Sequence, residues 1–321
     1  MSLFGTAKHY ARIYGHSALI LQISSFVTDF FRNFAHDMNY TLNCNGQLLD
    51  LSTPRVMGIV NVTPDSFYAG SRVQTEHAIA RRTEEILEQG GDIIDVGACS
   101  TRPGSEPVGE QEEAERLRLA LSAIRRVAPD AVVSVDTYRP MLARMAVEEF
   151  GAAIINDVGD PSTFNGQRSM ANAQCSMLNG QWSMFRMVSR LRVPYIYMSR
   201  RPTVSDILID CAEAVESLRS MGQKDIVVDP GFGFGKTLED NYLVMSQLER
   251  LKMLNLPILV ALSRKSMIYR LLDSRQEEAL TGTIALNTVA LMKGASILRA
   301  HDVRQAVECI KLVAAANKPE K

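Results

Sequence analysis

The chain has 321 residues, of which 46% are hydrophobic and 22% are charged, and its formal net charge is −1. This composition is typical of a globular protein, and the near-neutral charge excludes a general electrostatic attraction to nucleic acids or anionic membranes. The five cysteines are scattered and include no C-x-x-C pair, which argues against a disulfide framework or a structural zinc site. The same cysteine pattern leads us to expect a reducing compartment, the cytoplasm. Because no run of 18 apolar residues occurs, we expect no transmembrane helix.

Residues 1–38 form an extension with its own composition. Residues 18–31 (ALILQISSFVTDFF) are apolar and follow Lys8 and Arg12, with no acidic residue before position 29. This pattern fits an amphipathic targeting segment or a membrane-surface helix, or else an extension that is poorly ordered or packs loosely on the domain. We favour the last interpretation, and Met38 would also make a natural start.

Residues 39–321 are predicted to form one domain, which opens with a short hairpin. Its turn is predicted at Asn45-Gly46, because both residues tolerate the positive φ angles that a tight hairpin turn needs. After residue 55, apolar runs rich in branched residues alternate with helical patterns, as buried parallel strands do. The runs are VMGIV (56–60), DIIDV (92–96), AVVSV (131–135), AAIIN (152–156), VPYIYM (193–198), DIVV (225–228), PILVAL (257–262) and ASILRA (295–300).

The helical patterns lie between these runs. Residues 75–89 place Ile79, Thr83 and Ile86 on one face, and Gly90-Gly91 then ends the helix. Residues 109–127 are acidic at their start and basic at their end, which suits the helix dipole. Eight β/α units over residues 56–316 indicate an α/β fold of the (β/α)8 or TIM-barrel type, with an open doubly wound sheet as the alternative.

In a (β/α)8 barrel, chemistry is found at the C-terminal ends of the strands. Nearly every predicted strand ends in a residue that can hydrogen-bond or carry charge: Asn61, Asp95, Asp136, Asn156, Asp157, Ser199, Asp229, Ser263, Arg264, Lys265, Arg299 and His301. Any one of them could be a solvated or capping group, because Asp and Asn are common at turns. Their convergence on one rim predicts a polar ligand site.

The run DPGFGFGKT (229–237) follows the sixth predicted strand. It is not a phosphate-binding P-loop, because Pro230 stands where that motif requires glycine, and the dinucleotide-binding glycine pattern fails as well. We expect Asp229 to end the strand and the glycines to let backbone approach a ligand. Thr237 is expected to cap the next helix, and Lys236 to be a solvated loop lysine.

Seven motifs, in order, resemble those of the dihydropteroate synthase family: NVTPDSF (61–67), DIIDVGACSTRPG (92–104), SVDT (134–137), INDV (155–158), DPGFGFGK (229–236), LSRKSMI (262–268) and LRAHDV (298–303). That family joins a dihydropterin-methyl diphosphate to p-aminobenzoate on a TIM barrel, with Mg²⁺, and releases diphosphate. The resemblance therefore implies a transferase of folate biosynthesis that is a sulfonamide target. It also implies small-molecule substrates, no nucleic-acid or membrane partner, and a homodimer.

The resemblance also assigns the site residues. The implied substrate-binding residues are Thr101, Asp136, Asn156, Asp229, Lys265, Arg299 and His301. Carboxylates and an amide suit the amine-rich edge of a pterin, while Arg299 and His301 would grip the diphosphate. The implied p-aminobenzoate pocket and loops contain Phe67, Arg102, Pro103, Phe234 and Ser266. Asn61 would be the Mg²⁺ ligand, with phosphate oxygens and water as the other ligands.

The sequence departs from this family in two stretches. The segment 160–192 is longer than usual and contains NGQRSM (165–170) and NGQWSM (179–184), which resemble a small tandem duplication, while the loop at 199–210 is shorter. Two alternatives to a synthase stay open: a non-catalytic pterin-binding relative, and a pterin-binding barrel of the corrinoid-linked methyltetrahydrofolate methyltransferase type. The LSRKS and Asn61 motifs favour the synthase.

Overall fold

The computed structural model describes residues 40–62, 72–99, 108–159 and 183–317. The predicted extension and most of the 160–192 segment lie outside these ranges, so the division of the chain at residue 38 stays a prediction. Within the described ranges, no helix combines the length and the apolar character needed to cross a membrane.

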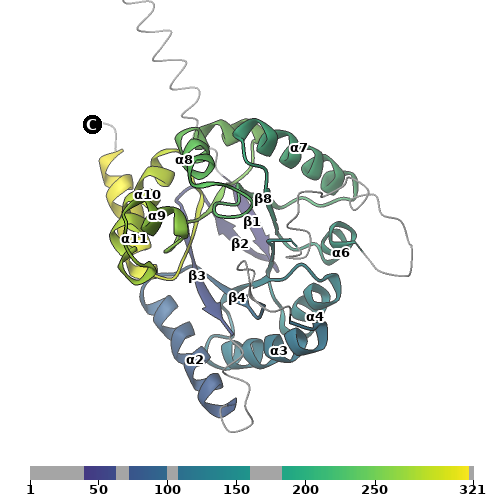
Figure 1. Cartoon of the computed structure of the whole chain (residues 1–321). Coiled ribbons are helices and arrows are strands. Elements are labelled where there is room, and N and C mark those ends of the chain that lie inside the picture. Colours follow the sequence, from purple (N-terminus) through teal and green to yellow (C-terminus); the bar gives the residue numbers. More distant parts are fainter. Residues whose placement is uncertain (1–39, 63–71, 100–107, 160–182, 318–321) are drawn as a thin grey trace, which may run out of the picture. The chain divides into compact units, whose positions relative to one another are not determined.

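Eight parallel strands form one sheet in the order β8-β7-β6-β5-β4-β3-β10-β9. They are β3 (Arg55–Asn61), β4 (Ile93–Gly97), β5 (Val132–Asp136), β6 (Ile154–Asp157), β7 (Tyr195–Met198), β8 (Ile226–Asp229), β9 (Leu259–Ala261) and β10 (Ile297–Ala300). A parallel bridge between Val228 and Ile258 joins the two edges of the sheet and closes the ring that Figure 1 shows. The predicted (β/α)8 barrel is confirmed, and the open doubly wound sheet is excluded.

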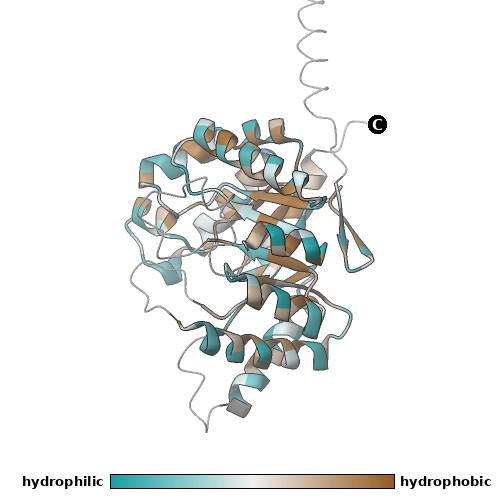
Figure 2. Cartoon of the chain, turned by 90° about the vertical axis from the view of Figure 1, so that its right-hand side faces the viewer, coloured by the Kyte–Doolittle hydropathy of each residue, from teal (hydrophilic) through white to brown (hydrophobic). Residues whose placement is uncertain are grey.

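Helices surround the barrel on its outside (Figure 1). The α-helices of the described ranges are α2 (Arg72–Glu88), α3 (Glu110–Val127), α4 (Pro140–Phe150), α6 (Met184–Leu191), α7 (Val204–Ser220), α8 (Leu238–Ser246), α9 (Ser266–Leu271), α10 (Leu280–Met292) and α11 (Val303–Ala316), and short 3-10 turns are η3 (Leu248–Leu254) and η4 (Gln276–Glu278). The predicted inward face of α2 is confirmed, because Ile79, Thr83 and Ile86 are all buried. In Figure 2 the strands are mostly hydrophobic, whereas the helices carry hydrophilic residues on their outer faces.

The predicted hairpin is formed by β1 (Thr41–Cys44) and β2 (Gln47–Asp50), which pair antiparallel. Asn45 and Gly46 both have positive φ, at 55° and 89°, as expected for an Asn-Gly turn. Leu42 and Cys44 pack in one cluster with residues of the barrel interior, among them Ile93. The hairpin therefore packs apolar side chains against residues of the barrel interior. A buried leucine such as Leu42 contributes about 1.5–3 kcal/mol to folding.

The register of the sheet brings the polar strand ends to one rim. Asp136 of β5 lies beside Gly97 of β4 on one side and beside Asn156 of β6 on the other. Asp229 of β8 lies beside Met198 of β7. Because parallel strands end at the same edge, these side chains share the mouth of the barrel, where a ligand site was predicted.

Candidate active site

An arginine and two carboxylates form the centre of the site. The Arg299 guanidinium donates from Nε to Asp95 Oδ2 at 2.6 Å and from Nη2 to Asp136 Oδ2 at 2.9 Å. The Asn156 amide donates to the same Asp95 oxygen at 3.3 Å. Three predicted site residues, Asp136, Asn156 and Arg299, are thus brought together by strands β5, β6 and β10.

Asp95 is a site residue to which the sequence reasoning gave no role. It lies inside β4 and is fully buried. A charged residue within a strand that is buried on both faces requires a buried partner, and this requirement is the signal by which the sequence could have identified it. Its partner, Arg299, is 204 residues away in the sequence.

Buried acceptor atoms in the centre are left without a partner. Within the described residues, Asp95 Oδ1, Asn156 Oδ1 and Ser134 Oγ are buried and make no hydrogen bond. An unsatisfied buried polar atom costs about 1–3 kcal/mol, so such atoms gathered at a barrel mouth indicate a ligand that brings its own donors. A flat heterocycle with several N–H groups on one edge meets this requirement.

Burial changes the protonation of the carboxylates and of the nearby lysine. Desolvation raises the pKa of Asp136 to about 7, against the opposing attraction of Arg299, and the charges of Asp95 and other acidic residues raise it further. Burial also raises the pKa of Asp229, while Lys265 opposes this shift. The pKa of Lys265 is lowered to about 8 by desolvation, against the attraction of Asp229. The site therefore holds groups that change protonation near neutral pH.

The raised pKa of Asp136 predicts a pH-dependent stability. The pKa rises from 3.8 to about 7 on folding, so the folded state holds this proton more tightly than the unfolded state does. The contribution of Asp136 to stability is therefore complete below about pH 4 and is lost as the pH rises through about 7. We expect Asp136→Asn to raise the melting temperature relative to wild type more at pH 8 than at pH 5. Equal differences at both pH values would contradict this.

The glycine-rich loop after β8 is built around Asp229 and a partly buried lysine. Asp229 Oδ1 accepts the Gly231 N–H at 2.7 Å. Glycine is required at position 231, since φ is 67° and a Cβ would lie 2.1 Å from the Ser199 carbonyl oxygen. The Lys236 ammonium donates to the carbonyls of Gly231 at 3.1 Å, Phe234 at 3.3 Å and Ser199 at 3.4 Å.

The expectation that Lys236 is a solvated loop lysine is therefore wrong. Desolvation lowers its pKa to about 8, against the attraction of Asp229. The glycine turns fold the loop back, so that two of its carbonyls face the ammonium group. Because the ammonium group also contacts the Ser199 carbonyl, it links the loop after β8 to the loop after β7. The predicted role of Thr237 is confirmed, because it caps α8 in a capping box with Asp240.

Lys236→Met is expected to weaken binding of a pterin about tenfold. The substitution removes bonds to three carbonyls, of which that of Gly231 keeps a partner, the Phe234 N–H, and this loosens the loop that follows Asp229. The matched control is Lys224→Met, at the exposed opposite end of β8. Calorimetric titration checks this, and an affinity in Lys236→Met equal to that of the control would show that the loop does not need the lysine.

The loop after β9 brings Lys265 to the same side of the site. Its ammonium group donates to the Phe232 carbonyl oxygen and lies 4.7 Å from the centre of the Phe234 ring. Lys265 precedes the first residue of α9, Ser266, and is the N-cap position of that helix. Three more predicted site residues, Lys265, Ser266 and Phe234, are thus near one another on two adjacent loops.

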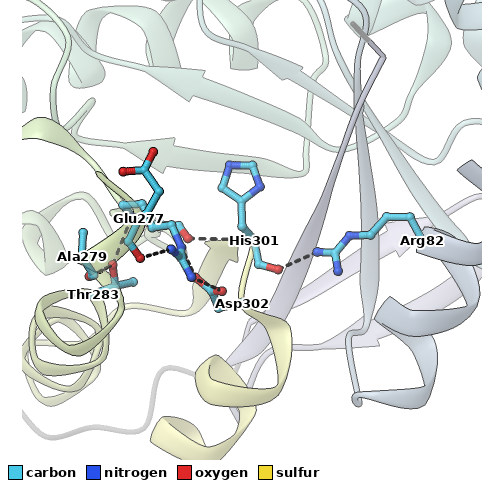
Figure 3. Close-up of polar contacts among 8 residues, drawn as sticks. Arg82, Glu277, Ala279, Thr283, His301 and Asp302 are labelled. Carbon is cyan, nitrogen blue, oxygen red and sulfur yellow. Dashed lines mark hydrogen bonds and ion pairs between the residues drawn. The ribbon is translucent and has the colours of Figure 1, made fainter. Parts of the chain in front are cut away.

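Asn61 ends β3, and His301 immediately follows the neighbouring strand β10. The His301 N–H donates to Ser263 Oγ at 3.1 Å, and its carbonyl accepts from Arg82 Nη2 at 2.6 Å. In Figure 3 its imidazole points away from the Arg82 contact. The Asn61 side chain is exposed at the end of β3. The other predicted residues, Phe67, Thr101, Arg102 and Pro103, lie outside the described ranges.

Comparison with known proteins gives consistent results. Residues 57–301 match the model of a family described as "Pterin binding enzyme". A dihydropteroate synthase of Clostridium beijerinckii is 38% identical over 266 residues, which are 80% of this chain and 92% of that protein. One of Bacillus subtilis is 37% identical over 268 residues, which are 80% of this chain and 87% of that protein.

Solved structures are similar over the same part of the chain. A dihydropteroate synthase of Xanthomonas albilineans with 4-aminobenzoic acid has a TM-score of 0.76 and 33% identity, and covers 88% of this chain and 100% of its own. The same enzyme in complex with 7,8-dihydropteroate has a TM-score of 0.72 and 31% identity, with coverage of 88% and 100%. Both likenesses extend over the barrel described above.

Proposed function

Because the chain belongs to the family of pterin-binding enzymes, we propose that it catalyses the dihydropteroate synthase reaction. In this reaction p-aminobenzoate condenses with (7,8-dihydropterin-6-yl)methyl diphosphate to give 7,8-dihydropteroate and diphosphate. The observation that carries the proposal is the cluster of Arg299, Asp95, Asp136 and Asn156, with its unsatisfied buried acceptors, at the mouth of the barrel. The ligands of the similar solved structures, 4-aminobenzoic acid and 7,8-dihydropteroate, support it.

The pterin ring is the part of the substrate that this cluster suits. Its amine and ring N–H groups donate to Asp136, Asn156 and Asp229, and the free oxygens of Asp95 and Asn156 are available to the same edge. The Lys265 ammonium group donates to the acceptor side of the ring. Analogues without these N–H groups would leave the buried acceptors unpaired, so the site discriminates strongly against them.

The chemical step replaces a C–O bond by a C–N bond. The amine nitrogen of p-aminobenzoate attacks the methylene carbon, the bonding electron pair leaves with the diphosphate oxygen, and the amine releases one proton. An aromatic amine is neutral at pH 7, so the protein contributes position and charge rather than a strong base. Arg299 and His301, with Thr101, hold the departing diphosphate, where negative charge develops.

The second substrate is proposed to bind above the loops after β8 and β9. Phe234 and Ser266 contact p-aminobenzoate, the serine at its carboxylate. Phe67 and Pro103 pack its ring, while Arg102 helps to order the leaving group. The position of Phe234 beside Lys265 supports this arrangement, because it places the aromatic ring next to the proposed pterin site.

Mg²⁺ is proposed to enter with the diphosphate. Within the described residues, no group of three or more His, Cys, Asp or Glu side chains could hold a metal ion. The exposed amide of Asn61 fits Mg²⁺ as one oxygen ligand, with phosphate oxygens and water completing the shell, as is usual for this ion. When bound, the ion supplies positive charge that stabilises the leaving diphosphate.

Location and assembly are proposed from the family resemblance. We propose a cytoplasmic enzyme that is inhibited by sulfonamides and forms a homodimer. Exposed apolar side chains on the late helices support a dimer, since Met292 of α10 is 66% exposed and Leu312 of α11 is 71% exposed. Such side chains are available for contact with a second copy.

The assay that tests the function measures both products. The protein is incubated with the pterin diphosphate and Mg²⁺, with and without p-aminobenzoate. We expect equimolar dihydropteroate and diphosphate, formed only when p-aminobenzoate is present. Tight pterin binding without either product would instead identify a non-catalytic relative, and methyl transfer from methyltetrahydrofolate would identify the corrinoid-linked type.

A further inference from the structure

The loops after β9 and β10 are joined by a bidentate ion pair between Arg264 and Asp302. Arg264 donates from Nε to Asp302 Oδ2 at 2.9 Å and from Nη2 to Asp302 Oδ1 at 3.0 Å (Figure 3). The side chains are 26% and 20% exposed, so this pair is more sheltered than a typical surface ion pair. Arg264 immediately precedes Lys265, and Asp302 immediately follows His301. The pair therefore links two loops that both carry proposed ligand-binding residues.

Arg264 is held in an unusual backbone conformation. Its φ is 52°, in the left-handed region that a residue with a side chain seldom adopts. Its N–H donates to Thr283 Oγ1 at 3.1 Å, and its Nη1 donates to the Glu277 carbonyl at 2.6 Å. Thr283 is fixed in turn by a bond to the Ala279 carbonyl at 2.8 Å. Such a conformation persists where its surroundings determine it, and it is often found at functional sites.

A second arginine fixes the far side of His301. Arg82 of α2 donates to the His301 carbonyl at 2.6 Å and to the Ile59 carbonyl of β3 at 3.3 Å. On the other side, Ser263 Oγ accepts the His301 N–H at 3.1 Å. The backbone of His301 is thus held by Arg82, which also contacts β3, and by Ser263 of the loop after β9 (Figure 3).

We propose that Arg264 and Asp302 are positioning residues, which touch no substrate and set how the Lys265 loop stands relative to the His301 loop. This inference rests on the proposed function, which assigns Lys265 to the pterin and His301 to the diphosphate; the pair would fix the positions of these two residues relative to each other. Catalysis by position is sensitive to such a pair, because a displacement of about 1 Å costs as much as a hundredfold in rate. If the pair only stabilised the fold, breaking it would lower the melting temperature and leave the ratio of kcat to pterin affinity unchanged.

The experiment compares mild and severe changes in the pair. The variants are Arg264→Lys, Arg264→Ala, Asp302→Asn and the double variant Arg264→Ala/Asp302→Asn. Asp302 occupies the N-cap position of α11 without a side-chain capping bond, so Asp302→Asn removes the charge without loss of a cap, and Arg264→Lys keeps the charge without the planar fork. The matched control is Arg304→Ala, which removes an ion pair to Glu308 whose side chains are 73% and 54% exposed. Each protein is measured for kcat, for KM of both substrates, for affinity towards a pterin without diphosphate, and for melting temperature.

We expect kcat to fall on the order of tenfold or more in Arg264→Ala and in Asp302→Asn. Affinity for the pterin without diphosphate should stay within about twofold of wild type. The double variant should be no worse than the worse single variant, because either change breaks the same pair. Arg264→Lys should lie between wild type and Arg264→Ala, and Arg304→Ala should match wild type.

Three results would overturn the inference: wild-type kcat in the folded variants, equal losses of kcat and pterin affinity, or additive losses in the double variant. A wild-type protein that forms no dihydropteroate would refute the proposed function instead. The positioning role is then decided by the affinity for inorganic diphosphate. A loss of about tenfold in Asp302→Asn, which the control does not share, supports the role, and an unchanged affinity overturns it.

Discussion

Asp229→Asn is expected to weaken binding of a pterin on the order of a hundredfold or more while the barrel stays folded. Asp229 ends β8 and is buried, and its Oδ1 accepts the Gly231 N–H at 2.7 Å. The substitution keeps the shape of the side chain but removes its charge and turns an acceptor into a donor. An amide N–H group would then face the amine-rich edge of the ligand, which provides donors as well.

Asp136→Asn should have a similar effect, since Asp136 is the other proposed pterin carboxylate whose pKa is raised by burial. Calorimetric titration with a pterin measures the loss. The matched control is Asp225→Asn at the opposite end of β8, where the carboxylate accepts the Asn43 N–H of the hairpin at 3.4 Å. Unchanged pterin affinity in both site variants would refute the assignment, and loss of the folded state in either variant would show that the carboxylate has a structural role.

Arg299→Met should abolish activity and lower the free energy of unfolding by about 3–5 kcal/mol at pH 8. Arg299 is the cation between Asp95 and Asp136, and the side chain of Asp95 is fully buried. Methionine keeps much of the volume but leaves two carboxylates in a low-dielectric site without their partner. Removing one member of a buried pair costs more than the pair itself contributes, because the remaining charge cannot recover its hydration.

Denaturant unfolding at pH 8 and pH 5 measures this cost. The loss should be smaller at pH 5, since Asp136 has a pKa of about 7 and is then protonated. Adding Asp136→Asn to Arg299→Met should restore part of the stability without restoring activity, because it removes one uncompensated charge. A single variant as stable as wild type at pH 8 would show that Arg299 does not neutralise this cluster.

The elements of the fold were predictable from features that are local in the chain. Branched apolar runs of four to six residues predicted the strands, and the spacing of Ile79, Thr83 and Ile86 predicted the buried face of α2. The Asn45-Gly46 pair predicted the hairpin turn, and Thr237 predicted the start of α8. These features depend on backbone preferences and on periodicity within a few residues, so the order of residues is sufficient to determine them.

The placement of Asp136, Asn156 and Asp229 at one rim was predictable, because all three lie at the carboxyl ends of parallel strands, which meet there. The pairing between residues was not. Asp95 of β4 meets Arg299 of β10, with strand β3 between them, and Arg264 meets Asp302 between two loops, at separations of 204 and 38 residues. Lys236, expected in solvent, is enclosed by carbonyls of its own loop. Only the tertiary structure decided these features, because ion pairing and desolvation depend on which groups closure of the barrel brings within a few ångströms, and this is not a property of neighbouring positions in the sequence.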